Sequence, residues 1–262
     1  MSRMKTLFYL FFLFSLTLVS QETIESSLLN KSKLDVETFI GIDNFKSTYY
    51  VQNNVFYKNT ASKHISYNNL QLGDLTHANV FNPLKINLFY KDFNTVIILD
   101  NRLAEIFKID FNTLSEYKNV THVSTGHDNT LWLFNQDTQQ LELYDYKSHT
   151  TRAKTLPVQS DVLDLKSNYN TCWLLTKNYL YVYNYFGSLL SKMKNDGFIQ
   201  LSENNDDLFL KKENGLFYLK QGKGIPVPVE TSNLLINQFY ATNETLYIYD
   251  SKFLYEYHLK LK

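Results

Sequence analysis

The residues best placed to do chemistry are four polar side chains that recur at similar intervals. They are His122, Asp164, Gln200 and Gln238, separated by 42, 36 and 38 residues, and each stands directly before an apolar residue. A histidine beside an aspartate can act as an acid/base pair, and four polar groups together can bind a polar ligand or an ion. Alternatively, they line a wet interior, because buried polar groups need hydrogen-bond partners. We take the four as candidate ligand-binding residues and assign no catalytic residue.

The sequence carries no other catalytic or cofactor motif. It lacks a phosphate-binding glycine loop, a cysteine pair, a zinc-protease helix motif and a nucleophile-elbow motif. His122 and His127 are five residues apart, so on a strand they face opposite ways and do not form a metal site by themselves. Cys172 is the single cysteine and lies in an apolar run, which favours a buried core thiol. We therefore predict no metal and no cofactor.

Six similar segments must position these residues. Each begins with Thr or Asp, continues with four mostly apolar residues and a short polar break, and ends in an aromatic-rich alternating run. This is the pattern of a β-hairpin. The segments begin at Thr48, Thr95, Thr130, Thr171, Asp207 and Thr245, with spacings of 47, 35, 41, 36 and 38 residues. Two positions after these residues stand Tyr50, Ile97, Trp132, Trp173, Phe209 and Tyr247.

A strand-like run precedes each hairpin, and a more polar strand follows it. The preceding runs cover residues 37–43, 85–90, 120–125, 162–166, 198–202 and 236–241. Asn and Asp residues, which favour tight turns, separate these runs from the hairpins. Four strands in about 40 residues are the blade of a β-propeller.

We therefore predict an all-β fold, a six-bladed β-propeller of four-stranded antiparallel blades, formed as a single domain by residues 21–262. The last repeat ends at its third strand. We expect the N-terminal segment 24–36 to supply the missing outer strand and to close the ring. A β-sandwich or an open solenoid is the alternative fold.

The run HDNTLWLFNQDTQQLELYDY at residues 127–146 resembles the repeats of the six-bladed propeller superfamily, including NHL-type, TolB-like and sensor-type propellers. The Phe-rich start, the few Arg and the many Lys, Asn and Tyr resemble exported propellers of Bacteroidota. The pairs Gly126-His127 and Tyr144-Asp145 are similar to the Gly-His and Trp-Asp pairs of WD40 repeats, but their spacing differs and the other repeats of this chain lack them. Because members of the superfamily bind proteins, glycans or small ligands, or act as hydrolases and lyases, the resemblance implies an architecture and not an activity.

Residues 1–20 contain, in this order, the basic region, the apolar region and the cleavage site that are typical of a secretory signal peptide. Arg3 and Lys5 precede fourteen uncharged residues, and the small residue Ser20 is followed by a polar pair. We expect cleavage after Ser20 and export to the periplasm or the outside of the cell; an uncleaved anchor is the alternative. No cysteine stands at the cleavage site, so we do not expect a lipoprotein, and we expect no transmembrane segment after cleavage.

A second candidate surface is the rim formed by the hairpin loops. If the loops between second and third strands share one end of the ring, they bring together Asn101, Arg102, Asp137, Tyr179 and Lys212, which are the candidate partner-binding residues. Solvated turns are the alternative. The longest connection between blades, residues 64–83, contains His77 and Phe81, and long excursions from a compact scaffold often carry function.

The numbers of basic and acidic residues indicate which kinds of partner the protein can bind. The chain has 26 basic and 26 acidic residues and only three Arg, which argues against nucleic-acid binding. We predict an exported, non-catalytic β-propeller that acts as a protein-binding or assembly module in the cell envelope. The alternative is a protein or enzyme that binds a carbohydrate or another small polar ligand at the central tunnel. A small-ligand sensor is a third hypothesis.

Overall fold

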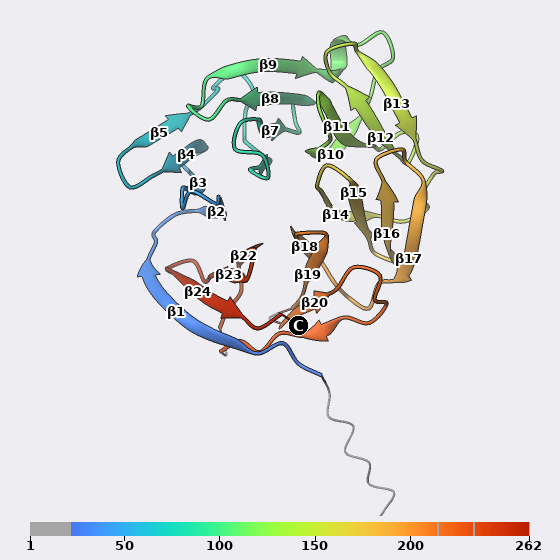
Figure 1. Cartoon of the computed structure of the whole chain (residues 1–262). Helices are drawn as coiled ribbons and strands as arrows, with labels where there is room; N and C mark the ends of the chain where they lie inside the picture. Colours follow the sequence, from blue (N-terminus) through green and yellow to red (C-terminus); the bar gives the residue numbers. More distant parts are fainter. Residues whose placement is uncertain (1–21, 214, 233, 262) are drawn as a thin grey trace, which may run out of the picture.

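The chain folds into six four-stranded antiparallel sheets arranged in a ring around an axis (Figure 1). This computed structural model describes residues 22–213, 215–232 and 234–261. The prediction of an all-β, six-bladed β-propeller is confirmed. The predicted signal peptide, residues 1–20, lies outside the described residues. In the described part of the chain, no helix is long and apolar enough to cross a bilayer.

The blades are numbered in chain order, and their strands are given from the axis outwards. Blade 1 contains β2 (Thr38–Ile42), β3 (Thr48–Gln52), β4 (Val55–Asn59) and β5 (His64–Tyr67). Blade 2 contains β6 (His77–Asn79), β7 (Ile86–Tyr90), β8 (Thr95–Leu99) and β9 (Glu105–Asp110). Blade 3 contains β10 (Val120–Thr125), β11 (Thr130–Asn135), β12 (Gln140–Asp145) and β13 (Thr150–Lys154). Blades 4 and 5 contain β14 (Val162–Ser167), β15 (Thr171–Thr176), β16 (Tyr179–Asn184) and β17 (Leu189–Lys194); and β18 (Gln200–Asn204), β19 (Asp207–Lys212), β20 (Gly215–Leu219) and β21 (Val227–Pro228). Blade 6 contains β22 (Gln238–Thr242), β23 (Thr245–Tyr249), β24 (Phe253–Leu259) and β1 (Ser26–Lys33).

The Thr or Asp at the start of each repeat begins a strand in every blade. In blades 1 and 4 an Asx side chain closes the turn before this strand; in blade 4 the backbone N–H groups of Asn170 and Thr171 donate to Asn168 Oδ1. In blade 5 the two turn residues, Asn205 and Asp206, both have positive φ, which a tight hairpin turn requires. Local turn chemistry therefore sets where the repeats begin.

Blade 2 differs from the prediction in one respect. Residues 85–90 were expected to form its innermost strand, but that position belongs to β6, and residues 86–90 form the second strand. The prediction was wrong because β6 is only three residues long and carries neither a β-branched nor an aromatic residue, so it gives no strand signal. As a consequence, Leu88 lies in the core between blades and not at the axis.

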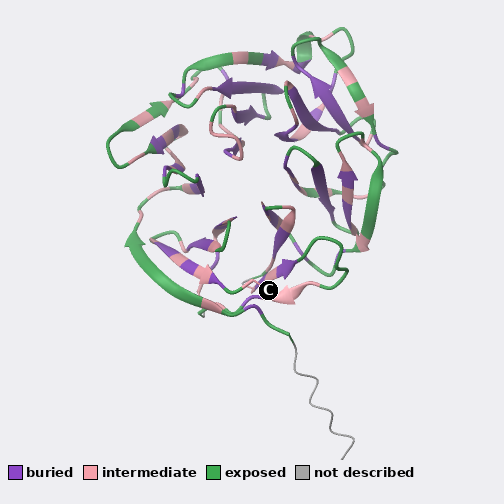
Figure 2. Ribbon diagram, in the orientation of Figure 1, coloured by how far each residue is buried: buried purple, intermediate pink, exposed green. Residues whose placement is uncertain are grey.

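The core lies between neighbouring blades. Middle strands are buried on both faces, whereas outer strands such as β1 and β17 are exposed (Figure 2). The large residue two positions into each repeat is buried in five blades, while Tyr50 in blade 1 is half-buried. The face-to-face packing of sheets explains why the second strands are continuous apolar runs.

The N-terminal strand β1 belongs to the same sheet as the last strands of the chain. It pairs antiparallel with β24, from Ser26 opposite Leu259 to Lys33 opposite Phe253. Just before it, Ile24 forms a parallel bridge with Val229 of blade 5 and is buried. The outer strand of blade 6 therefore comes from the opposite end of the sequence.

Candidate functional site

The six innermost strands (β2, β6, β10, β14, β18 and β22) surround the axis of the ring, and cavities between their side chains form a channel there. A mid-channel cavity of about 170 Å³ lies between blades 1, 2, 4, 5 and 6. A mouth cavity of about 360 Å³ opens where the first strands turn into the second, and a side cavity of about 250 Å³ lies between blades 2, 3 and 4. Val80, Phe81, Glu203 and Tyr240 line both the mid-channel and the mouth cavities.

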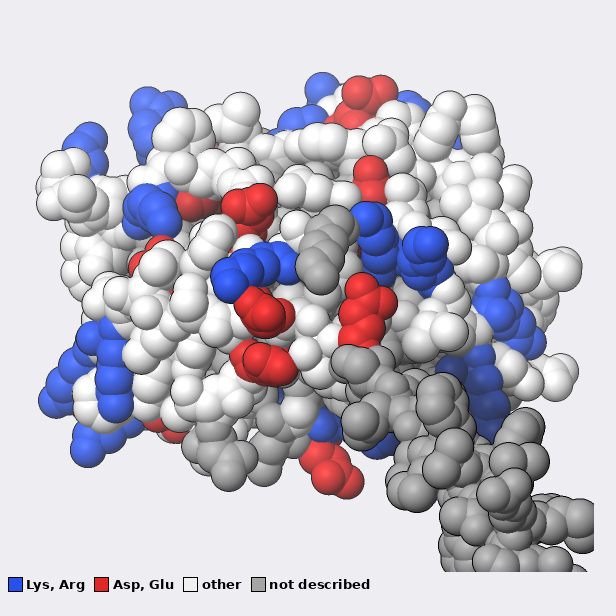
Figure 3. Space-filling model, turned by 60° about the horizontal axis from the view of Figure 1, so that its bottom comes forward, with Lys and Arg blue, Asp and Glu red and all other residues white. Residues whose placement is uncertain are grey.

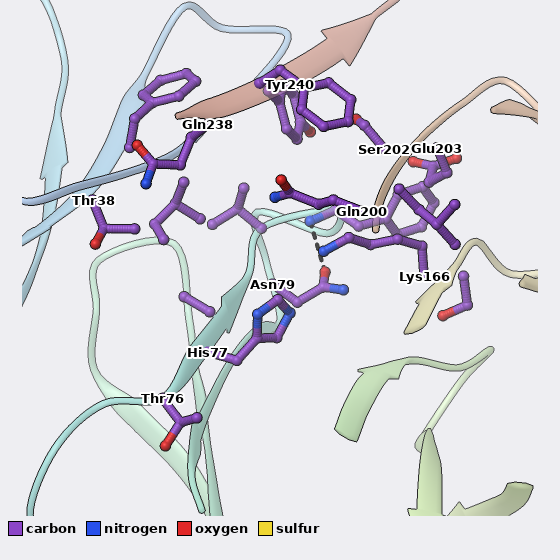
Figure 4. Close-up of a pocket in the computed structure, with 18 residues that line it drawn as sticks. Thr38, Thr76, His77, Asn79, Lys166, Gln200, Ser202, Glu203, Gln238 and Tyr240 are labelled. Atoms are coloured by element: carbon purple, nitrogen blue, oxygen red, sulfur yellow. Dashed lines mark hydrogen bonds between the residues drawn. The ribbon is translucent and has the colours of Figure 1, made fainter. Parts of the chain in front are cut away.

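The four candidate ligand-binding residues occupy equivalent positions in blades 3 to 6. Each stands opposite the residue four positions after the start of its repeat: His122 opposite Phe134, Asp164 opposite Leu175, Gln200 opposite Lys211, and Gln238 opposite Tyr249. His122 and Asp164 line the side cavity, whereas Gln200 and Gln238 line the mid-channel cavity (Figure 4). The structure thus divides the four residues between two neighbouring cavities. Their role as ligand-binding residues remains a prediction.

Asp164 is held in place by the backbone. Its Oδ1 accepts a hydrogen bond from the N–H of Leu165 at 2.8 Å, and its Oδ2 accepts one from the N–H of Leu201 at 2.7 Å. The second bond joins blade 4 to blade 5. The Nζ of Lys166 lies 3.7 Å from Oδ1. Because both carboxylate oxygens accept backbone hydrogen bonds, Asp164 helps to join two blades.

The two histidines at the side cavity are neutral at neutral pH. Burial lowers the pKa of His77 to about 3, and the positive charge of Lys166 contributes to the lowering. Burial also lowers the pKa of His122, although the Asp164 carboxylate opposes the shift. The Nδ1 of His122 lies 3.0 Å from the Thr121 hydroxyl. Neutral rings at this position can donate and accept hydrogen bonds but do not carry a charge.

Glu203 is the most perturbed carboxyl group of the channel. Burial raises its pKa to about 8; the nearby Asp206 adds to the rise and Lys166 opposes it. Burial likewise raises the pKa of Tyr240, whose ring packs so closely on blade 1 that a Cβ on Gly41 would lie 2.8 Å from it. In the described part of the chain, neither the Glu203 carboxyl nor the Tyr240 hydroxyl has a hydrogen-bond partner. At neutral pH both groups are protonated and able to donate into the channel.

The amide of Gln238 supplies an acceptor in the same cavity. Its Oε1 is buried and has no hydrogen-bond partner among the described residues. Figure 4 shows Gln238 and Tyr240 on one side of the mid-channel cavity, with Gln200, Glu203 and Lys166 beside them and His77 across from them. A buried polar atom without a partner costs about 1–3 kcal/mol. The cavity therefore favours an occupant that can donate a hydrogen bond to Gln238.

The mouth of the channel combines amide groups with exposed aromatic rings. Asx side chains join the turns of successive blades: Asn168 donates to Asp206 at 2.6 Å, Asn204 donates to the carbonyl of Asn243 at 2.5 Å, and Thr242 donates to Asn44 at 3.2 Å. The rings of Phe81 and Tyr169, from blades 2 and 4, meet with their centroids 5.0 Å apart. The mouth is thus formed by turns that are hydrogen-bonded to one another and also carry aromatic side chains.

The candidate rim residues lie at two opposite ends of the ring. Consecutive strands of a blade alternate in direction, so turns between first and second strands, and between third and fourth strands, lie at the mouth end. Asp137, Tyr179 and Lys212 flank second-to-third-strand turns and lie at the opposite end. Because β6 is the first strand of blade 2, the turn with Asn101 and Arg102 joins third and fourth strands and lies at the mouth end. The expectation that all five residues share one rim does not hold.

Sequence reasoning missed several channel residues. His77 was assigned to a connection between blades, because its three-residue strand gave no signal. Lys166 lay in a predicted inner strand and Glu203 lies in an observed one, but the residues at the equivalent positions differ in type from blade to blade. The signal that could have found Lys166 is its position in the sequence. It follows Asp164 by two residues, which places both on the same face of β14.

The fold and the channel define the class of protein, a six-bladed β-propeller with a polar axial channel. No protein-family model matches the sequence, and no curated protein matches it. Among solved structures, the chain is similar to a streptogramin B lyase, with a TM-score of 0.64 and 11% identity over 89% of this chain and 88% of the lyase.

Two further solved structures are similar. A catalytically inactive virginiamycin B lyase from Staphylococcus aureus, solved with quinupristin, has a TM-score of 0.60 and 10% identity, covering 88% of this chain and 99% of the lyase. BamB from Moraxella catarrhalis has a TM-score of 0.50 and 11% identity, covering 81% of this chain and 69% of that chain. These identities support a common fold alone, because one fold hosts many functions.

Proposed function

We propose that this chain is an exported, non-catalytic binding protein of the cell envelope, which holds a protein partner at the mouth end of its propeller. The observation that carries the proposal is a group of exposed apolar side chains on the mouth-end turns, which we call the mouth patch. It consists of the exposed residues Phe45, Leu84, Tyr169, Tyr185 and Phe186, together with the half-buried Phe81.

Ring contacts join members of the mouth patch in two places. Tyr169 meets Phe81, and Phe45, Phe81 and Tyr169 line the mouth cavity together. The ring of Tyr185 lies 5.5 Å from that of His127 and 4.0 Å from that of Phe186. Exposed apolar groups rimmed by polar residues mark interaction sites, and aromatic side chains dominate the binding energy of protein interfaces. The mouth cavity offers room for a side chain of the partner.

The charge distribution agrees with a protein partner. On the face shown in Figure 3, Lys and Arg are interspersed with Asp and Glu. The proposal of export rests on the signal-like residues 1–20.

The test is affinity capture of the mature domain from crosslinked native envelope, read by mass spectrometry. Phe45 and Phe186 are 83% and 67% exposed, and the double variant Phe45→Ser/Phe186→Ser should lose a stoichiometric partner that the wild type retains. Leu70 and Leu156, at the opposite end, are 88% and 86% exposed, so Leu70→Ser/Leu156→Ser is a matched control that should retain it. A partner lost equally by both variants, or by neither, contradicts the proposal.

A second candidate function is binding of a glycan or another small polar ligand in the channel. It is favoured by the unpartnered acceptor of Gln238 beside the protonated Glu203. A thermal-shift screen of glycans and metabolites should then find a ligand that stabilises the wild type but not Gln238→Ala. A ligand that stabilises both proteins equally binds elsewhere.

A further inference from the structure

Blade 5 has a much shorter outer strand than the blade beside it. Its outer strand β21 has two residues and pairs only with Phe217 and Tyr218 of β20, whereas β17 in blade 4 has six residues. Between β20 and β21 the chain runs through an exposed loop, residues 220–226. The space between the outer parts of blades 4 and 5 is therefore not filled by a strand.

A groove of about 530 Å³ occupies this space. Its lining comes from both blades, and its base is apolar, formed by Trp173, Leu180 and Leu208, which are all almost fully buried. Val182, Met193 and Leu219 continue the apolar lining. The volume falls within the range of about 300–1,000 Å³ that is usual for small-ligand sites.

Basic groups border the groove. Lys220 and Lys223 belong to the lining loop, and Lys223 is exposed and forms no ion pair with a described residue. Among the described lining residues the single carboxylate is that of Asp206, which accepts a hydrogen bond from Asn168. The border therefore favours an anion.

We propose that this groove binds a long-chain fatty acid, with its acyl chain on the apolar base and its carboxylate at Lys223 of loop 220–226. An acyl chain brings no polar group into the groove. A peptide would bring backbone N–H and C=O groups, and burying these without partners is costly. The groove shares Asp206 with the mouth cavity, but none of the mouth-patch residues lines it.

Trp173 gives a direct readout, because it lines the groove. Trp132, the other tryptophan, packs in the core between blades 3 and 4. In Trp132→Phe, 9,10-dibromostearate below its micelle concentration should quench the remaining fluorescence of Trp173 in a saturable manner. In Trp173→Phe, the same probe should quench Trp132 far less. Unsaturable quenching, or equal quenching of the two tryptophans, overturns the proposal.

The position of the carboxylate is tested with surface variants that leave the core intact. In displacement of cis-parinaric acid, Lys223→Gln should weaken stearate binding about twofold to fivefold, the range expected for an exposed ion pair. The exposed Lys108 lies on blade 2, and Lys108→Gln should leave the affinity unchanged. Methyl stearate should bind the wild type more weakly than stearate. A groove that ignores stearate and binds an acidic, leucine-rich peptide is a protein-docking site, and that result also overturns the proposal.

Discussion

Trp132 and Trp173 occupy the same position in neighbouring blades but meet different surroundings. Trp132 is enclosed by the residues of blades 3 and 4, including Phe134 and Leu165. Trp173 packs between blades 4 and 5, where the short outer strand leaves the groove beside it. One position in a repeat thus gives a sealed core in one blade and the wall of a cavity in the next.

We expect Trp132→Ala to lower the free energy of unfolding by about 3–5 kcal/mol, the usual cost of removing a fully buried large side chain. Chemical denaturation of the mature domain measures the change. Tyr50→Ala is the matched control, because Tyr50 holds the equivalent position in blade 1 but is half-buried, and its cost should be smaller. A change below about 0.5 kcal/mol for Trp132→Ala would instead be typical of a surface position.

At the scale of elements, the outer strand β1 is unusual because it joins the two ends of the chain. Its eight residues are mostly exposed, so its contribution comes from backbone pairing with β24 and from the anchor residue Ile24. Ile24 packs into the cluster that includes Val229 of blade 5 and Leu259 of blade 6. Removing this segment would expose one edge of β24 and open that cluster.

We predict that deleting residues 24–36 from the mature domain removes most of its stability, because the deletion opens the sheet and the cluster together. Thermal denaturation followed by circular dichroism measures the loss. A chain trimmed only of residues 22 and 23 is the control and should melt almost as the wild type does. Adding the peptide 24–36 in trans should restore part of the loss. An unchanged melting temperature after the deletion would mean that the strand does not close the ring.

At the scale of the whole molecule, the ring encloses two titratable groups that respond to pH in opposite directions. Glu203 has a folded pKa of about 8 against an ordinary 4.5, so the folded state keeps a proton that the unfolded chain has lost. Its contribution to stability therefore falls as the pH rises from about 4.5 to 8. His77 has a folded pKa of about 3 against 6.5, so stability falls as the pH drops from about 6.5 to 3.

We predict that the melting temperature of the wild type falls between pH 6.5 and 8, and that Glu203→Gln reduces this fall, because Gln has no proton to lose. The two proteins should converge as the pH falls below about 4.5, where Glu203 becomes protonated both in the folded and in the unfolded chain. His77→Gln should reduce the decline on the acid side. Differential scanning fluorimetry across this range measures both effects. Parallel profiles for the wild type and Glu203→Gln would show that Glu203 titrates normally.

The sequence by itself determined the repeats and their number, because both depend on neighbouring residues. Alternation of apolar residues, Asx turns and the Thr or Asp at each repeat start act within about ten residues, and the observed strands begin at those positions. The equivalent placement of His122, Asp164, Gln200 and Gln238 also follows from counting along the repeats.

The tertiary structure alone decided what those positions do. The three-residue strand β6 is stabilised by its partner β7 and not by its own composition, and it moved Asn101 and Arg102 to the other end of the ring from Asp137. The proton on Glu203 depends on burial by blades that are distant in sequence, and the groove exists because β21 is shorter than its neighbour. Burial and charge–charge interactions depend on distance in space, which a linear pattern does not contain.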